Sequence, residues 1–256
     1  MVAFTSVFLC VVFPFVLSVE LKKCMYIPYS TEKKQITIEK ALFHEKKCYT
    51  QGIFLQDDIL YESCGQYNNS AFSKYKYPEM ELLSSKRIED KYFSEGIAAT
   101  NGTVVMLTWR EHEIFLFNHK TLEIERKMTY PYHGWGATSI NSSALYVTDG
   151  TNKIRRIAVT PSGVALISEF FVRRGNNYVS QLNDLSYFDK HFYINVYYED
   201  KIVVVDPTTG TVDGEIWCNV KRTGNEEVMN GIATISQNQI LVTGKYWDKM
   251  FLLRIE

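Results

Sequence analysis

The chain has 256 residues, 46% of them hydrophobic, and neither a Pro/Ser-rich linker nor a block of charge divides it, which predicts one domain with a large core. Its 28 Lys and Arg residues against 29 Asp and Glu residues give a formal net charge of −1 at pH 7. Without a basic excess, the chain offers no electrostatic attraction for nucleic acid or for an anionic membrane.

The N-terminal residues 1–18 carry no charged side chain and include an apolar run from Val7 to Leu17. This run is shorter than the roughly 20 residues that a membrane-spanning helix needs. We interpret it as a secretory signal peptide cleaved before Val19, although no Lys or Arg precedes the apolar core; the alternative is a buried N-terminal strand. The expected mature domain, residues 19–256, would then lie in the secretory pathway or outside the cell, without membrane attachment.

Four cysteines remain after the predicted cleavage, and an even number suits an oxidising compartment. Three pairings are possible among Cys24, Cys48, Cys64 and Cys218. Because a hairpin turning near Gln56 would set Cys48 opposite Cys64, we predict a disulfide between these two and a second one between Cys24 and Cys218. The alternative is that they are buried free thiols. The sequence also has three glycosylation sequons, beginning at Asn68, Asn101 and Asn141.

A repeated unit organises the rest of the chain. In each unit a polar or aromatic residue is followed by Gly, or by Leu in the fourth unit, and we call these dipeptides the marks: Gln51-Gly52, Glu95-Gly96, Trp135-Gly136, Asp184-Leu185 and Asn230-Gly231. Their second members are 44, 40, 49 and 46 residues apart. About ten residues after each mark comes an apolar run rich in β-branched and aromatic residues: Ile59–Tyr61, Val104–Leu107, Ala144–Val147, Phe192–Ile194 and Ile240–Val242.

A period in the forties that is built of short strands is typical of β-propeller blades. Third apolar runs follow at Glu113–Phe117 and at Lys201–Val205, and the second of these ends in the strong turn signal Asp206-Pro207-Thr208-Thr209-Gly210. No stretch keeps a helical apolar stripe for three turns. We therefore predict an all-β, five-bladed β-propeller rather than a β-sandwich, which would not place five marks at matching positions. Residues at the marks should converge on the central axis.

The candidates for chemistry lie at these marks. The sequence contains no Ser-centred nucleophile elbow and no phosphate loop, and its five histidines lack metal-ligand spacing, so we predict neither a metal site nor a cofactor. Glu95 stands between Phe93-Ser94 and Gly96-Ile97, where burial would raise the pKa of its carboxyl group toward neutrality. A residue that accepts and returns a proton needs such a pKa. The alternative is a structural Glu that ties two blades together.

Ten segments, read in order, resemble the plant and bacterial type of glutaminyl-peptide cyclotransferase. They are Tyr49–Ile53, Tyr61–Gly65, Phe93–Gly96, Leu107–Trp109, Gly134–Gly136, Leu182–Leu185, Asn195–Tyr197, Val205–Gly210, Met229–Ala233 and Val242–Trp247. Any one of them is weak, but their shared order across five units makes the resemblance specific.

The resemblance implies a metal-independent enzyme, an acyltransferase that converts the N-terminal glutamine of peptides or proteins to pyroglutamate and releases ammonia. It matches Glu95 to the family's proton-shuttling glutamate. It matches eight further positions to the pocket and its wall: Gln51, Trp109, Trp135, Asn183, Lys245, Tyr197, Tyr49 and Phe93. We expect peptides with N-terminal Gln as partners, no nucleic acid, and a monomer.

Three positions depart from the family pattern. Tyr197 replaces a Trp, Asp184 replaces a Glu, and His133 replaces a Glu before Gly-Trp-Gly. These changes concern substrate fit and rate rather than the type of reaction. Two other functions remain open on the sequence alone: an inactive propeller that binds a peptide or protein partner, and a calcium-dependent lactonase or sugar-active propeller. The second would need several carboxylates on the axis, and mainly Glu95 and Asp184 qualify.

Overall fold

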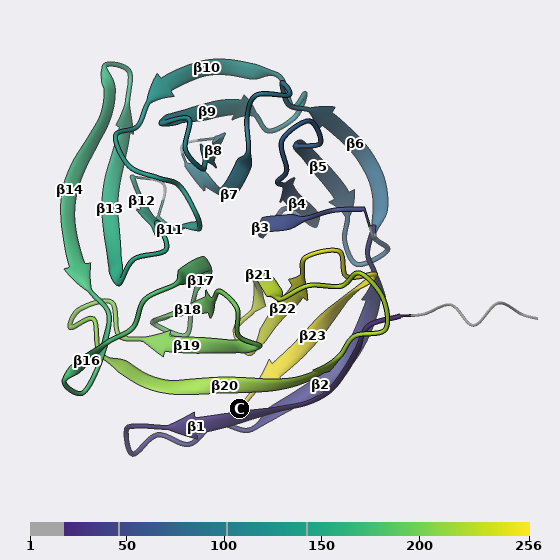
Figure 1. Cartoon of the computed structure of the whole chain (residues 1–256), viewed down its shortest axis with the longest axis vertical. Helices are drawn as coiled ribbons and strands as arrows, with labels where there is room; N and C mark the ends of the chain where they lie inside the picture. Colours follow the sequence, from purple (N-terminus) through teal and green to yellow (C-terminus); the bar gives the residue numbers. More distant parts are fainter. Residues whose placement is uncertain (1–17, 46, 101, 142) are drawn as a thin grey trace, which may run out of the picture.

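The computed structural model describes residues 18–256 except Lys46, Asn101 and Ser142. Its described part consists of strands, turns and loops without a helix, so no described helix could cross a bilayer. The strands form five antiparallel sheets arranged around a central axis, as Figure 1 shows. The predicted five-bladed β-propeller is confirmed. The predicted signal peptide falls on residues 1–17, outside the described part, apart from its last residue, Ser18; Cys10 and the sequon residue Asn101 also lie outside it.

The first three blades follow one another along the chain, each with four strands in sequence order from the axis outward. Blade 1 contains β3 (Thr50–Gln56), β4 (Ile59–Cys64), β5 (Ala71–Lys76) and β6 (Glu81–Arg87). Blade 2 contains β7 (Ser94–Thr100), β8 (Thr103–Thr108), β9 (Glu113–Asn118) and β10 (Ile124–Thr129). Blade 3 contains β11 (Ala137–Asn141), β12 (Ala144–Val147), β13 (Lys153–Thr160) and β14 (Gly163–Phe171).

The last two blades each recruit a strand from the N-terminal region. Blade 4 contains β17 (Leu182–Phe188), β18 (His191–Val196), β19 (Lys201–Val205) and β20 (Val212–Lys221), and β1 (Glu20–Pro28) is added at its outer edge. Blade 5 contains β21 (Met229–Ser236), β22 (Gln239–Gly244) and β23 (Lys249–Ile255), with β2 (Ile36–Phe43) as its outer strand. A short hairpin, β15 (Arg173–Arg174) and β16 (Asn177–Tyr178), connects blades 3 and 4.

The hydrophobic core is divided among five clusters, and each lies between two neighbouring blades. Between blades 1 and 2, for example, the rings of Phe72 and Phe117 pack with centroids 4.8 Å apart, and both side chains are fully buried. Because each sheet buries both faces against its neighbours, the strands next to the axis carry apolar residues on both sides, as the uninterrupted runs in the sequence indicate. The blades therefore hold one another in place.

The glycines of the marks allow the inner strands to meet backbone to backbone at the axis. A Cβ atom at Gly96 would lie 2.6 Å from the Cα of Gly136, and one at Gly136 would lie 2.2 Å from the carbonyl oxygen of Asn183. Such distances exclude any side chain. In the fourth unit the structurally equivalent residue is Asp184, so the mark there is Asn183-Asp184 and the predicted Asp184-Leu185 was shifted by one residue. The Asp184 carboxylate lies in the space that these glycines leave and accepts the backbone N–H of Ile232 at 2.9 Å.

Both predicted disulfides are present. Cys24 and Cys218 face each other on β1 and β20, and Cys48 is bonded to Cys64. The predicted hairpin register was wrong, however. The turn is the pair Asp57-Asp58, both with positive φ, so that Thr50 rather than Cys48 stands opposite Cys64. Cys48 precedes the strand, and a bulge after Thr50 accompanies its reach across to Cys64.

Candidate active site

One end of the central axis holds a cavity of about 150 Å³. It is lined by Tyr49, Gln51, Gln66, Phe93, Glu95, Trp109, Trp135, Asn183, Tyr197 and Lys245. All nine residues that the sequence analysis matched to a catalytic or binding role are in this set. Its volume would hold roughly five water molecules, which is the size of one amino-acid side chain rather than of an extended ligand.

The propeller geometry explains why these residues meet. Inner strands begin at this end of the axis, which brings Gln51 of β3, Glu95 of β7 and Asn183 of β17 to the cavity. Second strands end there, so residues just beyond their last positions, such as Trp109 after β8 and Lys245 after β22, also reach it. Every blade repeats this arrangement. The pocket is thus built by the repeat itself.

Gln66 is the lining residue that the sequence analysis missed. It lies two residues after the second strand of blade 1, next to Gly65, which has the position that Trp109, Tyr197 and Lys245 occupy in their own blades. Comparing the ends of the second strands would have pointed to Gly65, the residue before it. Asn230, at the fifth mark, was also overlooked: its side-chain amide donates to the carbonyl oxygen of Thr50 at 3.0 Å and to Gln51 Oε1 at 3.2 Å, and so orients that glutamine.

Glu95 is the acidic group of the cavity. Its side chain is 5% exposed, and it forms no side-chain hydrogen bond among the described residues. Burial raises the pKa of its carboxyl group well above the usual value, and the charges of Glu111 and Asp184 raise it further while Lys245 opposes them. The direction of this shift is the one that the sequence analysis expected, and a raised pKa favours a carboxyl group that accepts a proton and returns it.

Lys245 is the basic group, and aromatic rings surround it. Burial lowers the pKa of its ammonium to about 8, against the opposing effect of Glu95, Glu227 and Asp184. The ammonium donates to Gln51 Oε1 at 2.5 Å and lies 4.2 Å from the centroid of the Tyr49 ring. A cation in this position is held by a cation–π contact and one amide oxygen. Its charge is therefore easily lost.

Two polar atoms of the cavity wall are buried without a hydrogen-bond partner among the described residues, Nε1 of Trp135 and Oδ1 of Asn183. The first can only donate a hydrogen bond and the second can only accept one. Because leaving such groups unpaired costs about 1–3 kcal/mol each, their position in a cavity indicates a ligand that supplies both an acceptor and a donor. An amide is such a ligand.

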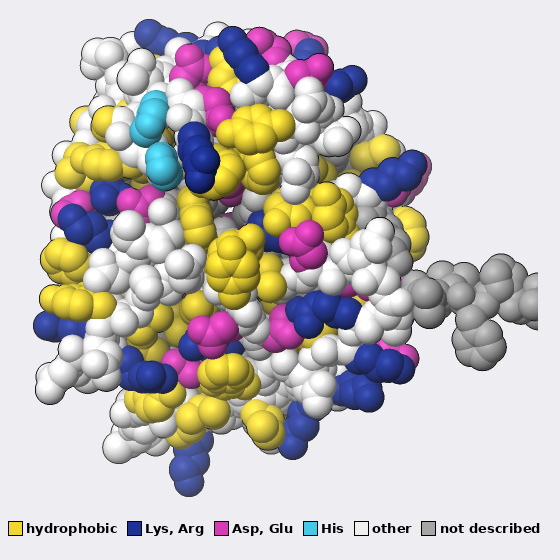
Figure 2. Space-filling model, in the orientation of Figure 1, with side chains coloured by type: hydrophobic (Ala, Val, Ile, Leu, Met, Phe, Trp, Pro, Cys, Tyr) yellow, Lys and Arg dark blue, Asp and Glu magenta, His cyan; other side chains and the backbone are white. Residues whose placement is uncertain are grey.

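Aromatic side chains form the rest of the wall. The ring centroids of Phe93 and Trp109 are 5.4 Å apart, and so are those of Tyr197 and Trp135. Both pairs pack edge to face. At the rim, Tyr67 and Tyr198 are 40% and 72% exposed. Figure 2 shows hydrophobic side chains gathered around the centre of the face in view. The cavity thus has apolar walls and polar groups at its base.

Of the three departures from the family pattern, Tyr197 lines the cavity, whereas His133 and Asp184 do not. The ring of His133 lies 5.4 Å from that of His112. Asp184 is fully buried, and burial raises the pKa of its carboxyl group despite the backbone N–H groups that it accepts. It influences the cavity through its charge.

A second cavity of about 200 Å³ occupies the opposite end of the axis. Its described lining residues come from the far ends of the inner strands, such as Gln56, Ser139, Ser186 and Thr234, and include no charged side chain. It offers no acid or base. The cavity that contains Glu95 is therefore the candidate active site.

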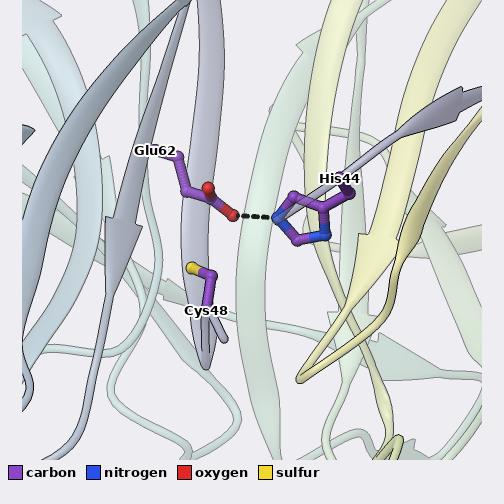
Figure 3. A group of neighbouring side chains, drawn as sticks. All are labelled: His44, Cys48 and Glu62. Atoms are coloured by element: carbon purple, nitrogen blue, oxygen red, sulfur yellow. Dashed lines mark hydrogen bonds and ion pairs between the residues drawn. The ribbon is translucent and has the colours of Figure 1, made fainter. Parts of the chain in front are cut away.

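Among the described residues, one group of three could in principle hold a metal ion: His44, Cys48 and Glu62 (Figure 3). The residues do not fit a metal. The sulfur of Cys48 is bonded to Cys64, and His44 Nε2 is 2.7 Å from Glu62 Oε1, so these two groups are each other's partners. A disulfide sulfur is not the thiolate that binds metals.

Comparisons with known proteins agree with this geometry. The family model for glutamine cyclotransferase matches residues 11–255. A glutaminyl-peptide cyclotransferase of Arabidopsis thaliana is 26% identical over 234 residues, which cover 87% of this chain and 72% of that protein. The crystal structure of Myxococcus xanthus glutaminyl cyclase superimposes with a TM-score of 0.75 and 25% identity, covering 86% of this chain and 96% of that one.

Proposed function

Because the chain belongs to the glutamine cyclotransferase family, we propose that it converts the N-terminal glutamine of peptides and proteins to pyroglutamate and releases ammonia. The observation that carries this proposal is a cavity of one side chain's size with a carboxyl group of raised pKa, a lysine of lowered pKa, and an unpaired donor and acceptor. Each of these features has a task in the reaction.

Binding uses the unpaired groups. The side-chain amide of the substrate glutamine offers a carbonyl oxygen to Trp135 Nε1 and an NH2 group to Asn183 Oδ1. Its methylene groups pack against the rings of Phe93, Trp109 and Tyr197. The cavity has room for this one side chain, and the glutamine binds in a curled conformation in which its α-amine approaches its own amide carbon. Holding this geometry supplies much of the rate enhancement.

The chemistry needs one proton acceptor that later becomes a donor. The neutral α-amine attacks the amide carbon, a C–N bond forms, and the carbonyl electrons move to the oxygen. Glu95 takes the proton from the attacking nitrogen and returns it to the amide nitrogen, whose C–N bond then breaks to release ammonia. The raised pKa of the Glu95 carboxyl group makes the uptake of this proton favourable.

Negative charge builds up on the carbonyl oxygen during the attack. The indole N–H of Trp135 and the ammonium of Lys245 are donors of the kind that stabilise such an oxyanion, and the buried setting strengthens their effect. Gln51 Oε1 accepts from the Lys245 ammonium and keeps it oriented. The intermediate thus meets positive charge that is already in place.

No step of this mechanism requires a metal, and we propose that the reaction is metal-independent. The engagement of His44 with Glu62 and of Cys48 with Cys64 supports this. We also propose a secretory location, which the two disulfides support because they persist in oxidising compartments. Glycosylation at Asn68, Asn101 and Asn141 would follow from that location.

The test is the turnover of Gln-Ala peptides in the presence of a strong chelator. Turnover is measured by the ammonia released and by mass spectrometry of the product. We expect full activity with the chelator, and no reaction with the same peptide acetylated at its α-amine. Loss of activity that added zinc restores would disprove metal independence. Binding of the peptide without any turnover would instead identify an inactive propeller.

A further inference from the structure

A larger groove adjoins the active-site cavity. It has a volume of about 680 Å³ and is lined by Lys47, Gly65, Gln66, Asn69, Asn225 and Tyr246. We call it the outer groove. It shares Gln66 with the cavity. The cavity accommodates one side chain, so the rest of a bound peptide must lie outside it, and the outer groove is a neighbouring hollow that can receive it.

The cavity and the groove share a wall. Gly65 packs so closely on cavity residues that a Cβ atom there would lie 2.4 Å from the Phe93 ring and 2.8 Å from Gln51 Cγ. On the other side Tyr246 directly follows Lys245, and its ring centroid is 5.0 Å from that of Tyr49. A chain that leaves the cavity beside Gln66 passes between these two sides.

Two residues of the groove have backbone conformations that are uncommon outside glycine. The φ angle is 117° at Gln66 and 60° at Tyr246. Such conformations cost energy and persist where the surrounding structure enforces them, frequently at ligand sites. Here they direct an amide and a phenol toward the same groove. Gln66 and Tyr246 are thus placed to contact a ligand in the outer groove.

The chemistry of the groove suits an acidic peptide. Gln66, Asn69 and Asn225 can hydrogen-bond to a peptide backbone, and Lys47 alone among the described lining residues carries a charge. Lys47 is exposed and forms no ion pair with a described residue. Neither of the two acidic residues that follow Asn225 lines the groove: Glu226 accepts the N–H of Gly224 at 2.6 Å, and Glu227 accepts the hydroxyl of Tyr49 at 3.0 Å.

We propose that the outer groove binds the residues that follow the first one in a peptide substrate, and that Lys47 favours an acidic side chain at the second or third position. This inference rests on the proposed cyclotransferase activity. Each extended residue advances the chain by about 3.3–3.6 Å, so a residue or two beyond the cavity lies along the groove. The substrate class is therefore N-terminal Gln peptides with an early Asp or Glu.

The experiment compares kcat/KM for Gln-Asp-Ala-Ala and Gln-Ala-Asp-Ala with the peptides that carry Asn or Lys at the same position. Asp and Asn have nearly the same size, so their ratio isolates the charge. At low salt we expect the parent to favour Asp over Asn by about two- to five-fold at one position, mainly through KM, as for an exposed ion pair. The preference should weaken as salt increases.

The variant Lys47→Glu should reverse the preference, so that the Lys peptide becomes better than the Asp peptide. Lys40→Glu is the matched control: Lys40 is an exposed residue of the outer strand β2, and this variant makes the same change in net charge. It should keep the parental Asp/Asn ratio. An Asp/Asn ratio of one in the parent, or an equal shift in both variants, would overturn the inference.

Failure of the proposed function gives a different result. If no peptide is turned over while Lys47→Glu and the parent have the same circular dichroism, the cyclotransferase proposal is wrong. The proposal for the outer groove is then tested separately, by measuring the affinity of the same peptides with calorimetry. Tighter binding of the Asp peptide by the parent but not by Lys47→Glu supports the groove, and equal or absent binding refutes it.

Discussion

Glu95 and Lys245 show how burial prepares two groups for opposite tasks. Burial disfavours the charged form of both, which raises the pKa of the carboxyl group and lowers the pKa of the ammonium to about 8. Both groups therefore exchange protons much closer to neutrality than they would in water. Groups whose environments shift their pKa values in this way are typical of acid–base catalysis.

Glu95→Gln should lower kcat by about two to four orders of magnitude, because the amide keeps the size of the side chain but cannot accept a proton. KM should change far less, since the rest of the cavity is intact. The control Glu125→Gln removes an exposed carboxylate from β10 and should leave kcat unchanged. If Glu95→Gln folded normally and kept kcat within a few-fold, Glu95 would be a structural residue.

The pH profile of kcat/KM should fall above about pH 8, because Lys245 loses its charge as the pH rises through its lowered pKa. On the acid side the profile should fall as Glu95 and the α-amine of the substrate become protonated. Lys245→Arg keeps its charge at all these pH values and should move the alkaline fall beyond about pH 10, even if its maximum is lower. A parental profile that stays flat from about pH 8 to 10 would contradict this role.

Residue-level prediction succeeded where the marks determine a position. Glu95 and Trp135 belong to marks, and their convergence follows from the repeat alone. Gln66 was missed because no mark precedes it directly and its left-handed backbone leaves no sign in the sequence. His133 immediately precedes Gly134-Trp135, yet the cavity does not include it. Which way a side chain points from a loop depends on packing that the pattern of residues does not record.

Between blades 5 and 1, the pair His44 and Glu62 links the residue after β2 to β4, 18 positions further along the sequence. Both side chains are buried; Thr50 Oγ1 donates to Glu62 Oε1 at 2.9 Å, and Thr243 Oγ1 is 3.3 Å from His44 Nδ1. Thr50 precedes Gln51, and Thr243 lies two residues before Lys245. The pair thus supports the two strands that supply the ammonium and its amide partner.

We expect His44→Gln or Glu62→Gln to lower the free energy of unfolding by about 3–5 kcal/mol, because each leaves a buried group without its partner. The double variant should lose less than the sum of the two. Burial lowers the pKa of His44, but the charge of Glu62 outweighs it and the net pKa is raised. The contribution of this pair to the stability of the folded state is therefore complete below about pH 6.5, the pKa of an unfolded histidine. It is lost as the pH rises through the raised pKa of His44. Urea unfolding at acidic and alkaline pH measures both effects, and strict additivity would refute the coupling.

The hairpin of β3 and β4 shows what element-level prediction can and cannot provide. The apolar runs correctly located both strands, and the opposition of Cys48 and Cys64 was inferred from a turn near Gln56. The actual turn at Asp57-Asp58 shifts the register so that Thr50 stands opposite Cys64, and a bulge follows Thr50 where Cys48 reaches across to Cys64. A bulge inserts one residue without a sequence signal, so the disulfide was predicted correctly from a register that was wrong.

At the scale of the whole molecule the two disulfides close loops of very different length, because the paired cysteines are 194 and 16 positions apart in the sequence. In the chain-entropy model these loops are worth about 5 and 3 kcal/mol. Replacing Cys24 and Cys218 by Ser should therefore lower the stability to urea more than replacing Cys48 and Cys64.

The effects on catalysis should be reversed. Cys48 precedes Tyr49 of the cavity, and Cys64 lies two residues before Gln66, so their replacement should raise KM, whereas Cys24 and Cys218 lie on the outer strands of blade 4. Steady-state kinetics on both folded double variants would check this. Equal KM values would show that the nearby disulfide does not position the wall.

The repeat predicted the number of blades but not how the ring closes. The predicted disulfide between Cys24 and Cys218 linked the segment of β1 to the end of the fourth unit. Nothing in the sequence of β2 assigns it to blade 5, because an outer strand is defined by the partner that it meets. The mixture of polar and apolar residues in β2, Ile-Thr-Ile-Glu-Lys-Ala-Leu-Phe, suits any outer position. Such long-range pairings are set by the complete ring.

The closure of blade 5 also sets an order during synthesis. Strand β2 leaves the ribosome before blade 1 and must wait for β23, its partner, which follows the inner strands of all five blades in the chain. Lys245 lies in the same late segment, so the ammonium of the active site arrives together with the strand that completes the ring. An incomplete chain therefore has neither a closed propeller nor an active site, and a nascent protein cannot act on peptides before its own folding is finished.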